Sequence, residues 1–478
     1  MKAGEIKKVD SLPHTAANKV HTVGSQPADC GAHVACSDKP VPSAKCYAER
    51  DCLEYRTDIR ASRPMKILYL CQVFETGNDT GSERHFYFCK YAMSRGHRVA
   101  AITSNVDYKN ARAKFARTTG TVSQSIDGVD IHYVYSYANF RGSFIKRFYY
   151  YLTYFFSSIS QALKMGKPDI VYAVSTPLTV GLLGYIISRL RGVPFVFEVT
   201  DLWPDAAVAC SVVKNRVLIT LANWLAMFCY RTSAHIVGLS RSMCESIVAK
   251  GIDKDKVSLI TNGVDLSLFN NREPNDARRI EIRTQYGFGD RFVAMYMGAH
   301  GAYNALDTII DAAMILRDDL RFLFVFVGDG DEKPNLQKRV SEHKLGNVLF
   351  FAPIPRVDSP DMLSAADAFV LPNRKGDFFS GNLPNKLFDY LASSRPIVVA
   401  GSGETPELVM AAGAGRCGQA ADSHAMANSL IELAEMPVKE RMAMGKKGRD
   451  YVFKYYDRNR LSEQFLKILS DVIKSKWL

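Results

Sequence analysis

Short apolar runs alternate with longer amphipathic stretches along most of the chain. From Met65 the runs are MKILYLC, RVAAITS, DIVYAVS, PFVFEVT, HIVGLS and KVSLITN, each bounded by polar or turn-forming residues. Strands buried on both faces form continuous apolar runs, and their alternation with helical stretches is typical of a parallel sheet covered by helices on both sides. The first part of the chain is therefore predicted to be a doubly wound, Rossmann-like α/β domain.

The same pattern lapses once and then begins again. After Asn262-Gly263-Val264-Asp265 a polar stretch follows, and then come RFVAMYMG, LRFLFVFVGDG, NVLFFAPI, AFVLPN and PIVVAG. The lapse predicts two domains, residues 65–270 and 271–455, and a C-terminal helix over 456–478 that either caps the second domain or crosses back to the first. Because ligands of open α/β sheets bind at the carboxyl ends of the strands, both domains are expected to face a shared cleft.

Length and composition agree with two globular cores. The chain has 478 residues, of which 47% are hydrophobic and 23% charged, which is more than one ordinary domain holds. Residues 1–64 lack the apolar stretch of a secretory signal and are predicted to be a mostly disordered leader. The uncharged stretch from Ile170 to Ile187 is punctuated by Pro177 and Gly181, which favours strand, turn and helix over a membrane span.

Charge and cysteine usage limit the partners. Lys and Arg exceed Asp and Glu by 61 to 49, which favours an anionic ligand. The basic residues are spread along the chain rather than gathered in a stripe, so nucleic acid is not expected. Cysteines in apolar surroundings indicate a reduced, cytosolic protein. No metal or cofactor is predicted, because Cys30, Cys36, Cys46 and Cys52 lack the paired spacing of a zinc site.

The segment from Phe369 to Ala400 carries the most informative chemistry. A strand ends near Pro372, a loop follows, and a helix is predicted from about Asn385 with Pro384 before it. The helix N-terminus and Lys386 favour an anion such as a diphosphate, and Asp389, one turn on, is placed to accept hydrogen bonds from ribose. The alternative is an ordinary capped helix with a surface Lys–Asp pair.

Two places in the first domain are candidate acceptor sites. Gly81 and Ser82 precede a helix, where small residues let a substrate approach the backbone, and Glu83 and Arg84 follow directly. A plain helix start with Ser82 as N-cap is the alternative. Asp201 follows PFVFEVT and is predicted to face the cleft, where it either orients an acceptor hydroxyl or caps the turn before Trp203-Pro204.

Aromatic and basic residues are concentrated between Arg141 and Met165, RGSFIKRFYYYLTYFFSSISQALKM. Tyr and Phe beside Lys and Arg suit a membrane interface. A helix packed on the first sheet fits the same pattern, so both interpretations stand at this point.

Six segments in order resemble one known family. They are TGSERHFYFCKYAMSRGHRV, EVTDLWPDA, NGVDLSLF, YMGAHGAYNALDTIIDAA, FVGDGDEKPNL and LPNKLFDYLASSRPIVV. From Met65 onward the chain resembles the large retaining glycosyltransferase family of the GT-B fold, often numbered four, in its capsule, exopolysaccharide and O-antigen branch. The resemblance implies transfer of a hexose or N-acetylhexosamine from a nucleotide-diphosphate sugar to a saccharide on a polyprenyl diphosphate, without a metal. It implies a cytoplasmic enzyme, peripheral on the inner face of the cytoplasmic membrane.

The resemblance also assigns residues. Asn262 to Asp265 fall at the interdomain hinge, and Asp389 takes the place of the acid that binds ribose. A first acid of that family would fall at Gly381, so the donor sugar is expected to contact the backbone of residues 380–383 or Asn382. The family's Arg and Lys after the first strand of the second domain are absent from Gly298 to Asn304. The remaining donor contacts expected are Lys386, Arg374, Lys375, Gly298 and His300, with Lys386 and Asp201 as the catalytic pair.

Two other functions fit the same fold. A sugar-nucleotide epimerase uses the same two domains, and fold does not fix function. A non-catalytic protein that binds a nucleotide sugar is the other, motivated by the missing acid at Gly381.

Overall fold

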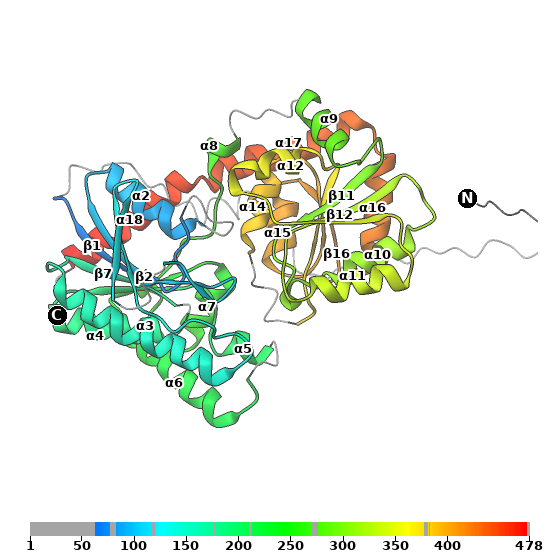
Figure 1. Cartoon of the computed structure of the whole chain (residues 1–478). Helices are drawn as coiled ribbons and strands as arrows, with labels where there is room; N and C mark the ends of the chain where they lie inside the picture. Colours follow the sequence, from blue (N-terminus) through cyan, green and yellow to red (C-terminus); the bar gives the residue numbers. More distant parts are fainter. Residues whose placement is uncertain are drawn as a thin grey trace, which may run out of the picture. The chain divides into compact units, whose positions relative to one another are not determined.

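The structure is a computed structural model, which describes residues 63–76, 83–115, 120–175, 177–209, 213–269, 276–376, 381 and 383–475. The predicted leader, apart from residues 63 and 64, and Cys30, Cys36, Cys46 and Cys52 lie outside these residues. Two α/β lobes follow one another along the chain (Figure 1).

The N-terminal lobe is built on a sheet whose strand order is β10-β9-β8-β7-β1-β2-β6-β5. All neighbours pair in parallel except β5, which runs antiparallel to β6 at the edge. The runs IVYAV and FVFEV are buried throughout, as strands between two helix layers must be. The strands are β1 (Lys66–Leu70), β2 (Arg98–Ser104), β5 (Val122–Ile126), β6 (Val129–Val134), β7 (Ile170–Val174), β8 (Phe195–Val199), β9 (His235–Gly238) and β10 (Val257–Leu259).

Helices cover both faces of this sheet. One core cluster joins the sheet to α3, α4, α6 and α7, and another joins its opposite face to α2 and to α18 (Arg458–Lys474) (Figure 1). A small hairpin of β3 (Val106–Asp107) and β4 (Arg112–Ala113) stands apart from the sheet. The helices are α2 (Arg84–Ser94), α3 (Phe144–Lys164), α4 (Thr179–Arg191), α5 (Asp205–Ala209), α6 (Arg216–Thr232), α7 (Arg241–Ala249) and the short turn η1 (Lys254–Lys256).

The C-terminal lobe has a parallel sheet of order β13-β12-β11-β14-β15-β16. Its strands are β11 (Phe292–Met297), β12 (Phe322–Val327), β13 (Val348–Phe351), β14 (Ala368–Pro372), β15 (Ile397–Ala400) and β16 (Gly415–Gly418). One face packs on α10 (Asp307–Ile315), α11 (Lys333–Glu342) and α16 (Ser423–Glu435). The other packs on α9 (Asp276–Gln285), α12 (Ser359–Ser364), α14 (Asn385–Ala392), α15 (Glu404–Ala411) and α17 (Val438–Tyr455). The predicted architecture of two doubly wound parallel-sheet domains is confirmed.

The chain crosses between the lobes twice, and the two crossings pair with each other. The backbone N–H of Val264 donates to Tyr456 O at 2.9 Å, and the N–H of Arg458 donates to Val264 O at 3.0 Å. Gly263 has no space for a side chain there, since a Cβ would lie 2.5 Å from Tyr456 O. The short helix α8 (Leu266–Phe269) follows the first crossing, and α18 (Arg458–Lys474) follows the second and packs on α2 of the N-terminal lobe. The boundary predicted near residue 270 falls outside the described residues.

Candidate functional site

A cavity of about 630 Å³ is lined by both lobes. On the N-terminal side it is bounded by residues that directly follow strands: Cys71 after β1, Thr200 after β8 and Leu239 after β9. This is where ligands of open parallel sheets bind. From the C-terminal lobe it is lined by Tyr303, Gly381, Leu383, Pro384 and Asn385.

Five of the predicted site residues meet at this cavity. They are Arg84, Asp201, Asn262, Pro384 and Asn385. Asn262, next to the hinge, donates its amide N–H to Leu383 O at 3.3 Å and so ties the two walls together. Gly81, Ser82 and Asn382 lie outside the described residues.

Asp201 follows β8 and its side chain is exposed to the cavity. The cavity walls remove part of its solvent, and this desolvation raises the pKa of the carboxyl group. The neighbouring Thr200 N–H donates to Ser175 Oγ at 2.9 Å, which fixes the end of β8 against the end of β7. Asp201 is therefore held on a rigid strand end, as a group that orients a substrate needs to be.

Arg84 lines the cavity but is fully engaged in structure. Its Nε lies 3.1 Å from Oε1 of the buried Glu198, and its terminal nitrogens donate to the carbonyl oxygens of Ile260 and Thr261. Burial alone would raise the pKa of Glu198, but Arg84, His85 and the Tyr172 hydroxyl outweigh it and hold that pKa below its usual value. A cation committed in this way holds the first helix to the sheet and has little capacity left for an acceptor.

Glu83 points elsewhere. It lines a separate cavity of about 320 Å³ with Tyr87, Lys90 and Asp265, and burial raises the pKa of its carboxyl group. Successive residues at a helix start face different directions, so Glu83 and Arg84 do not act on one ligand. The sequence grouped them by adjacency alone.

His85 is a cavity residue that the sequence analysis missed. Its Nδ1 lies 2.8 Å from the Tyr69 hydroxyl and 4.0 Å from Glu198 Oε1. Burial, more than the nearby charges, lowers the pKa of the imidazole to about 4, so the ring is neutral at pH 7. The available signal was Glu198 itself, because a carboxylate inside the apolar run PFVFEVT requires buried polar partners.

Lys386 lies one residue beyond the cavity wall, at the start of α14. Its ammonium donates to the Tyr296 hydroxyl and to Asn304 Oδ1 at 3.1 Å, and lies 4.2 Å from the centre of the Tyr296 ring. Burial lowers its pKa to about 7. Gly298 leaves room for this side chain, since a Cβ there would lie 2.8 Å from Lys386 Cε. Its partners among the described residues are neutral, so no carboxylate neutralises the charge.

Asp389 lies three residues further along α14 and is paired. Both terminal nitrogens of the Arg356 guanidinium donate hydrogen bonds to the Asp389 carboxylate, and the distance from Nη2 to Oδ1 is 2.6 Å. A ribose at this place would meet an ion pair rather than a lone carboxylate. Arg356 precedes α12, in the turn η3 (Arg356–Asp358), and nothing in the sequence pattern marks it.

The other predicted donor contacts lie behind or beside the cavity. His300 is fully buried, neither ring nitrogen has a hydrogen-bond partner among the described residues, and burial lowers its pKa to about 4. A direct contact of His300 with phosphate or sugar does not fit this arrangement. Arg374 and Lys375 are exposed after β14, and Arg374 Nε donates to Ala302 O in the turn η2 (Ala302–Asn304).

A second contact joins the lobes at the cavity. Glu404, the first residue of α15, accepts hydrogen bonds from the backbone N–H groups of Arg241 at 3.0 Å and Ser242 at 2.6 Å. A carboxylate from one lobe thus satisfies the N-terminus of α7 in the other. Gly381 packs on the same turn, where a Cβ would lie 2.7 Å from Ser242 Cβ. This contact explains why no acid fits at Gly381.

No group of three or more His, Cys, Asp or Glu side chains that could hold a metal occurs within the described ranges. In the same ranges, no helix combines the length and the apolar character needed to cross a bilayer.

Comparison with known proteins identifies the two lobes. Residues 80–268 match the family model described as "Glycosyltransferase Family 4", and residues 278–451 match "Glycosyl transferases group 1". The chain is 26% identical over 249 residues to a putative colanic acid biosynthesis glycosyl transferase, WcaI, of Escherichia coli, covering 51% of this chain and 60% of that protein. It is 29% identical over 227 residues to an E. coli UDP-Gal:alpha-D-GlcNAc-diphosphoundecaprenol alpha-1,3-galactosyltransferase, covering 45% and 54%.

Solved structures agree on the fold. The Anabaena protein Alr3699/HepE in complex with UDP-glucose matches with a TM-score of 0.65 at 17% identity, covering 85% of this chain and 100% of that one. WaaG, a glycosyltransferase involved in lipopolysaccharide biosynthesis, matches at 0.62 and 15%, covering 84% and 99%. The chain aligns with 60% and 54% of the lengths of the two curated E. coli relatives, which is less than two thirds of each. The two family models, in this order on two parallel-sheet lobes, place the chain in the GT-B glycosyltransferases of the family 4 and group 1 type.

Proposed function

We propose that this protein transfers a sugar, with retention of its anomeric configuration, from a nucleotide-diphosphate sugar to a saccharide carried on a polyprenyl diphosphate. The product would be a repeat unit of bacterial capsule, exopolysaccharide or O-antigen, and the sugar a hexose or N-acetylhexosamine. The observation that carries the proposal is the cavity lined by both lobes, with the N-terminus of α14 in its wall and the unneutralised Lys386 directly behind.

The donor diphosphate would bind at the start of α14. Backbone N–H groups at a helix N-terminus favour anions, and Pro384 and Asn385 bring that end to the cavity. Lys386 has a long flexible stem, and exchanging Tyr296 and Asn304 for phosphate oxygens breaks no ion pair. Arg374 is a second cation near the same loop, and the Asp389–Arg356 pair would contact the ribose.

The acceptor would bind on the N-terminal wall. In the reaction the bond between the anomeric carbon and the β-phosphate oxygen breaks, and the acceptor oxygen bonds to that carbon on the same face. The acceptor proton passes to the departing phosphate oxygen. Asp201 and the neutral His85 would orient the acceptor hydroxyl, while Lys386 and the helix end stabilise the charge of the leaving diphosphate. The proposal assigns this stabilisation to protein groups, with no metal.

The relatives described above support this proposal. One acts on a diphosphoundecaprenol-linked sugar with UDP-Gal, and one solved structure holds UDP-glucose. Both include a nucleotide sugar, which matches the anion-binding helix end on the cavity wall here.

The test uses purified protein and a panel of nucleotide sugars. A true donor should raise the melting temperature by mass action, and should then be consumed only when a lipid-linked saccharide is added, in the presence of EDTA. Conversion of the donor without acceptor would identify an epimerase. Donor binding without turnover on any acceptor in the panel would identify a non-catalytic partner, the function that the glycine at position 381 favours.

Such an enzyme would work in the cytoplasm at the inner face of the membrane. Helix α3 supports peripheral attachment, because Phe148, Tyr149 and Phe156 are 52 to 60% exposed on a helix that carries Lys146 and Arg147 near its start. Phe155 packs into the core instead, so the exposed aromatic face is narrower than the sequence alone indicates.

A further inference from the structure

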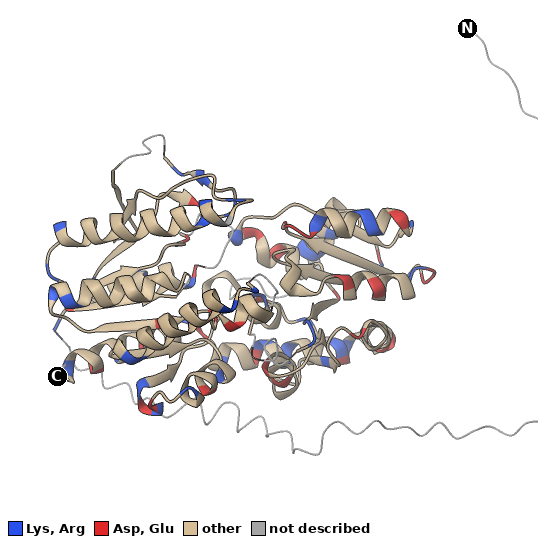
Figure 2. Cartoon of the chain, turned by 90° about the horizontal axis from the view of Figure 1, so that it is seen from below, with Lys and Arg blue, Asp and Glu red and all other residues tan. Residues whose placement is uncertain are grey.

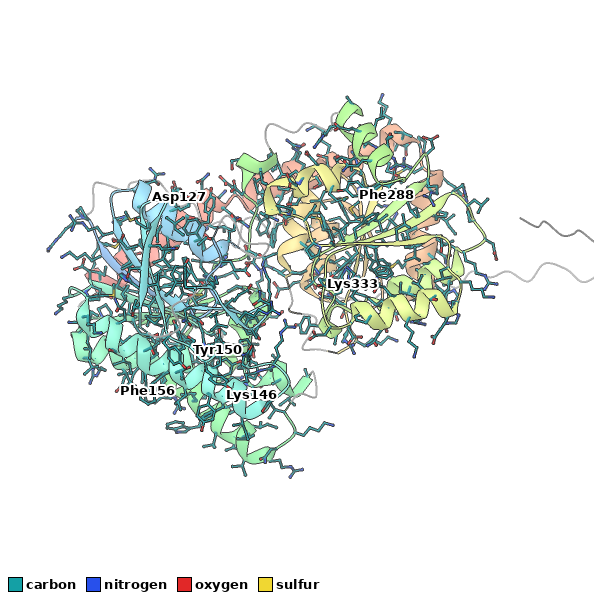
Figure 3. The ribbon with its side chains drawn as sticks, viewed as in Figure 1. Asp127, Lys146, Tyr150, Phe156, Phe288 and Lys333 are labelled. Carbon is teal, nitrogen blue, oxygen red and sulfur yellow. The ribbon has the colours of Figure 1, made fainter. Side chains whose placement is uncertain are left out.

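Helices α3, α4 and α6 form one layer over the N-terminal sheet, with α4 packed between the other two (Figure 1). The outer surface of this layer is apolar. Figure 3 labels Phe156 and Lys146, which are exposed on α3, and Tyr150, which is buried on the same helix. Of the nineteen large apolar side chains exposed in the described part of the chain, ten lie on these helices: Ile145, Phe148, Tyr149, Phe156, Leu163, Leu190, Val217, Leu218, Leu221 and Trp224.

The first half of α6 is a highly exposed part of this layer. Val217 is 67% exposed and Trp224 is 64% exposed, so both side chains lie mostly in solvent. The second half of α6 is anchored, because Cys229 and Tyr230 are buried in the sheet core. The helix therefore presents a largely exposed apolar end, where Trp224 stacks on Phe228 of the same helix, and is held firmly by its other end.

The charge of the layer has one sign. The sequences of α3, α4 and α6 contain no Asp or Glu. Figure 2 shows long tan helices with blue segments on this side of the lobe. Seven basic residues flank the apolar surface: Lys146, Arg147, Lys164, Arg189, Arg191, Arg216 and Arg231.

The exposed apolar side chains and the uniformly basic charge of this layer favour one kind of partner over another. A second copy docking face to face would bring seven positive charges against seven, which opposes association. An apolar surface bordered by Lys and Arg, with Trp and Tyr among its side chains, matches the headgroup region of an anionic bilayer.

We propose that α6 docks on an anionic bilayer together with α3, with Leu221 and Trp224 in the boundary between headgroups and acyl chains. The proposal deepens the proposed function by naming the surface that faces the lipid. Helix α5 precedes α6 in the chain and carries Asp205, which lines the cavity. A lipid-linked acceptor would keep its lipid in the bilayer beneath α6 while its saccharide reaches the cavity.

Tryptophan fluorescence reports on this surface directly. The chain has three tryptophans, and Trp203→Phe with Trp477→Phe leaves Trp224 alone. Vesicles of equal parts phosphatidylcholine and phosphatidylglycerol should shift the Trp224 emission to the blue, and brominated acyl chains should quench it. Pure phosphatidylcholine vesicles should give a much smaller response, because the basic residues then have no anionic lipid to attract them.

A surface variant completes the test. Val217→Ser, Leu221→Ser and Trp224→Ser together should weaken co-sedimentation with the anionic vesicles by roughly tenfold or more, since interfacial binding grows with buried apolar area. Leu320→Ser, at a highly exposed apolar residue of the other lobe, is the matched control and should change nothing. Transfer to a soluble acceptor analogue and the melting temperature should be unaffected in both.

Three results would overturn the proposal. In the first, the protein pellets with vesicles but the Trp224 fluorescence is not quenched. In the second, the Leu320→Ser control loses vesicle binding as much as the α6 variant does. In the third, the wild type is a dimer and the α6 variant is a monomer. The last would assign the surface to self-association. Failure of transfer on every acceptor, with vesicle binding intact, would count against the proposed function and leave the bilayer surface standing.

Discussion

Two cations beside the cavity, Arg84 and Lys386, differ in what neutralises them. Arg84 is paired with the buried carboxylate of Glu198 and with two backbone carbonyls. Lys386 is held by a hydroxyl, an amide oxygen and an aromatic face. A buried cation with a carboxylate partner serves structure, whereas one with neutral partners can take an anion without breaking an ion pair. The neutralising partner, rather than position at the cavity, therefore distinguishes a binding cation from a structural one.

The structural role of Arg84 can be tested by replacing its partner Glu198. Replacing it with Ala leaves the Arg84 guanidinium buried and unpaired, and loss of one partner of a buried pair costs about 3–5 kcal/mol. We expect Glu198→Ala to lower the free energy of unfolding by that amount, measured by urea denaturation. The double variant Arg84→Met, Glu198→Leu should recover much of the loss, because it leaves no lone charge.

Glu83→Ala is the matched control for that experiment. Glu83 is the next residue to Arg84 but is not its partner, so its loss should change stability little. If Glu198→Ala is as stable as this control, Arg84 is not held as the structure shows, and its assignment as a structural cation is wrong.

The proposed anion-binding role of Lys386 can be tested by replacing that residue. Removing one charge-stabilising group at a reaction centre costs roughly 100-fold in rate, so Lys386→Ala should lower kcat/KM for transfer by that factor or more. Its melting temperature should change little. Arg374→Ala, at an exposed cation of the same lobe, should have a smaller effect. The reverse ranking of the two variants would move the phosphate site to Arg374.

Most of the fold could be predicted from the sequence, but less of the candidate site. Continuous apolar runs identify the strands because both faces of each sheet are covered, and the run FVFEV shows this directly. Three strands of the two main sheets were not predicted, because they lack that signature: VSQSI of β5 is largely solvent-facing, VDIHYV of β6 contains Asp130 and His132, and GRCG of β16 is short and polar. The local pattern therefore identified the strands with continuous apolar runs, including the edge strands β10 and β13, and missed those without one.

The site was predictable where it rests on one helix start and not where it rests on pairing across the chain. Pro384, Asn385 and Lys386 follow from a local N-terminal signature. The pairing of Asp389 with Arg356, of Arg84 with Glu198 and of Glu404 with α7 joins residues 33, 114 and more than 160 positions apart. No periodicity in the sequence encodes such distant pairs, which depend on how the elements pack.

The titration of Lys386 should make both donor affinity and stability depend on pH. Burial lowers its pKa to about 7, so the free protein loses this charge as pH rises above 7. Donor affinity should then fall, by up to roughly tenfold per pH unit. Over the same range the unfolded chain keeps its proton while the folded protein releases it, so the unliganded protein should gain stability with rising pH. Calorimetry at several pH values measures the affinity, and denaturation without donor measures the stability.

Lys386→Arg separates this charge from other titrating groups. Arginine stays protonated throughout, so donor affinity in this variant should vary little between pH 7 and 9. A wild type and a variant that decline in parallel would show that another group, such as Asp201 or the donor itself, controls the affinity.

The smallest expected effect concerns the contact that brings the two cations' lobes together. Glu404→Gln replaces a carboxylate that accepts two backbone N–H bonds at the start of α7 with an amide that can satisfy only part of them. Loss of such a helix-end interaction costs about 0.5–2 kcal/mol. Because the cavity is built from both lobes, we expect the donor Kd to rise a few-fold, with little change in melting temperature, since Ser240 still caps α7 within its own lobe.

Glu407→Gln, an exposed carboxylate on the same helix, is the matched control and should leave the Kd unchanged. Equal donor affinity in the two variants would mean that Glu404 holds the lobes together without helping the donor to bind, and Lys386 would then act independently of the contact between the lobes.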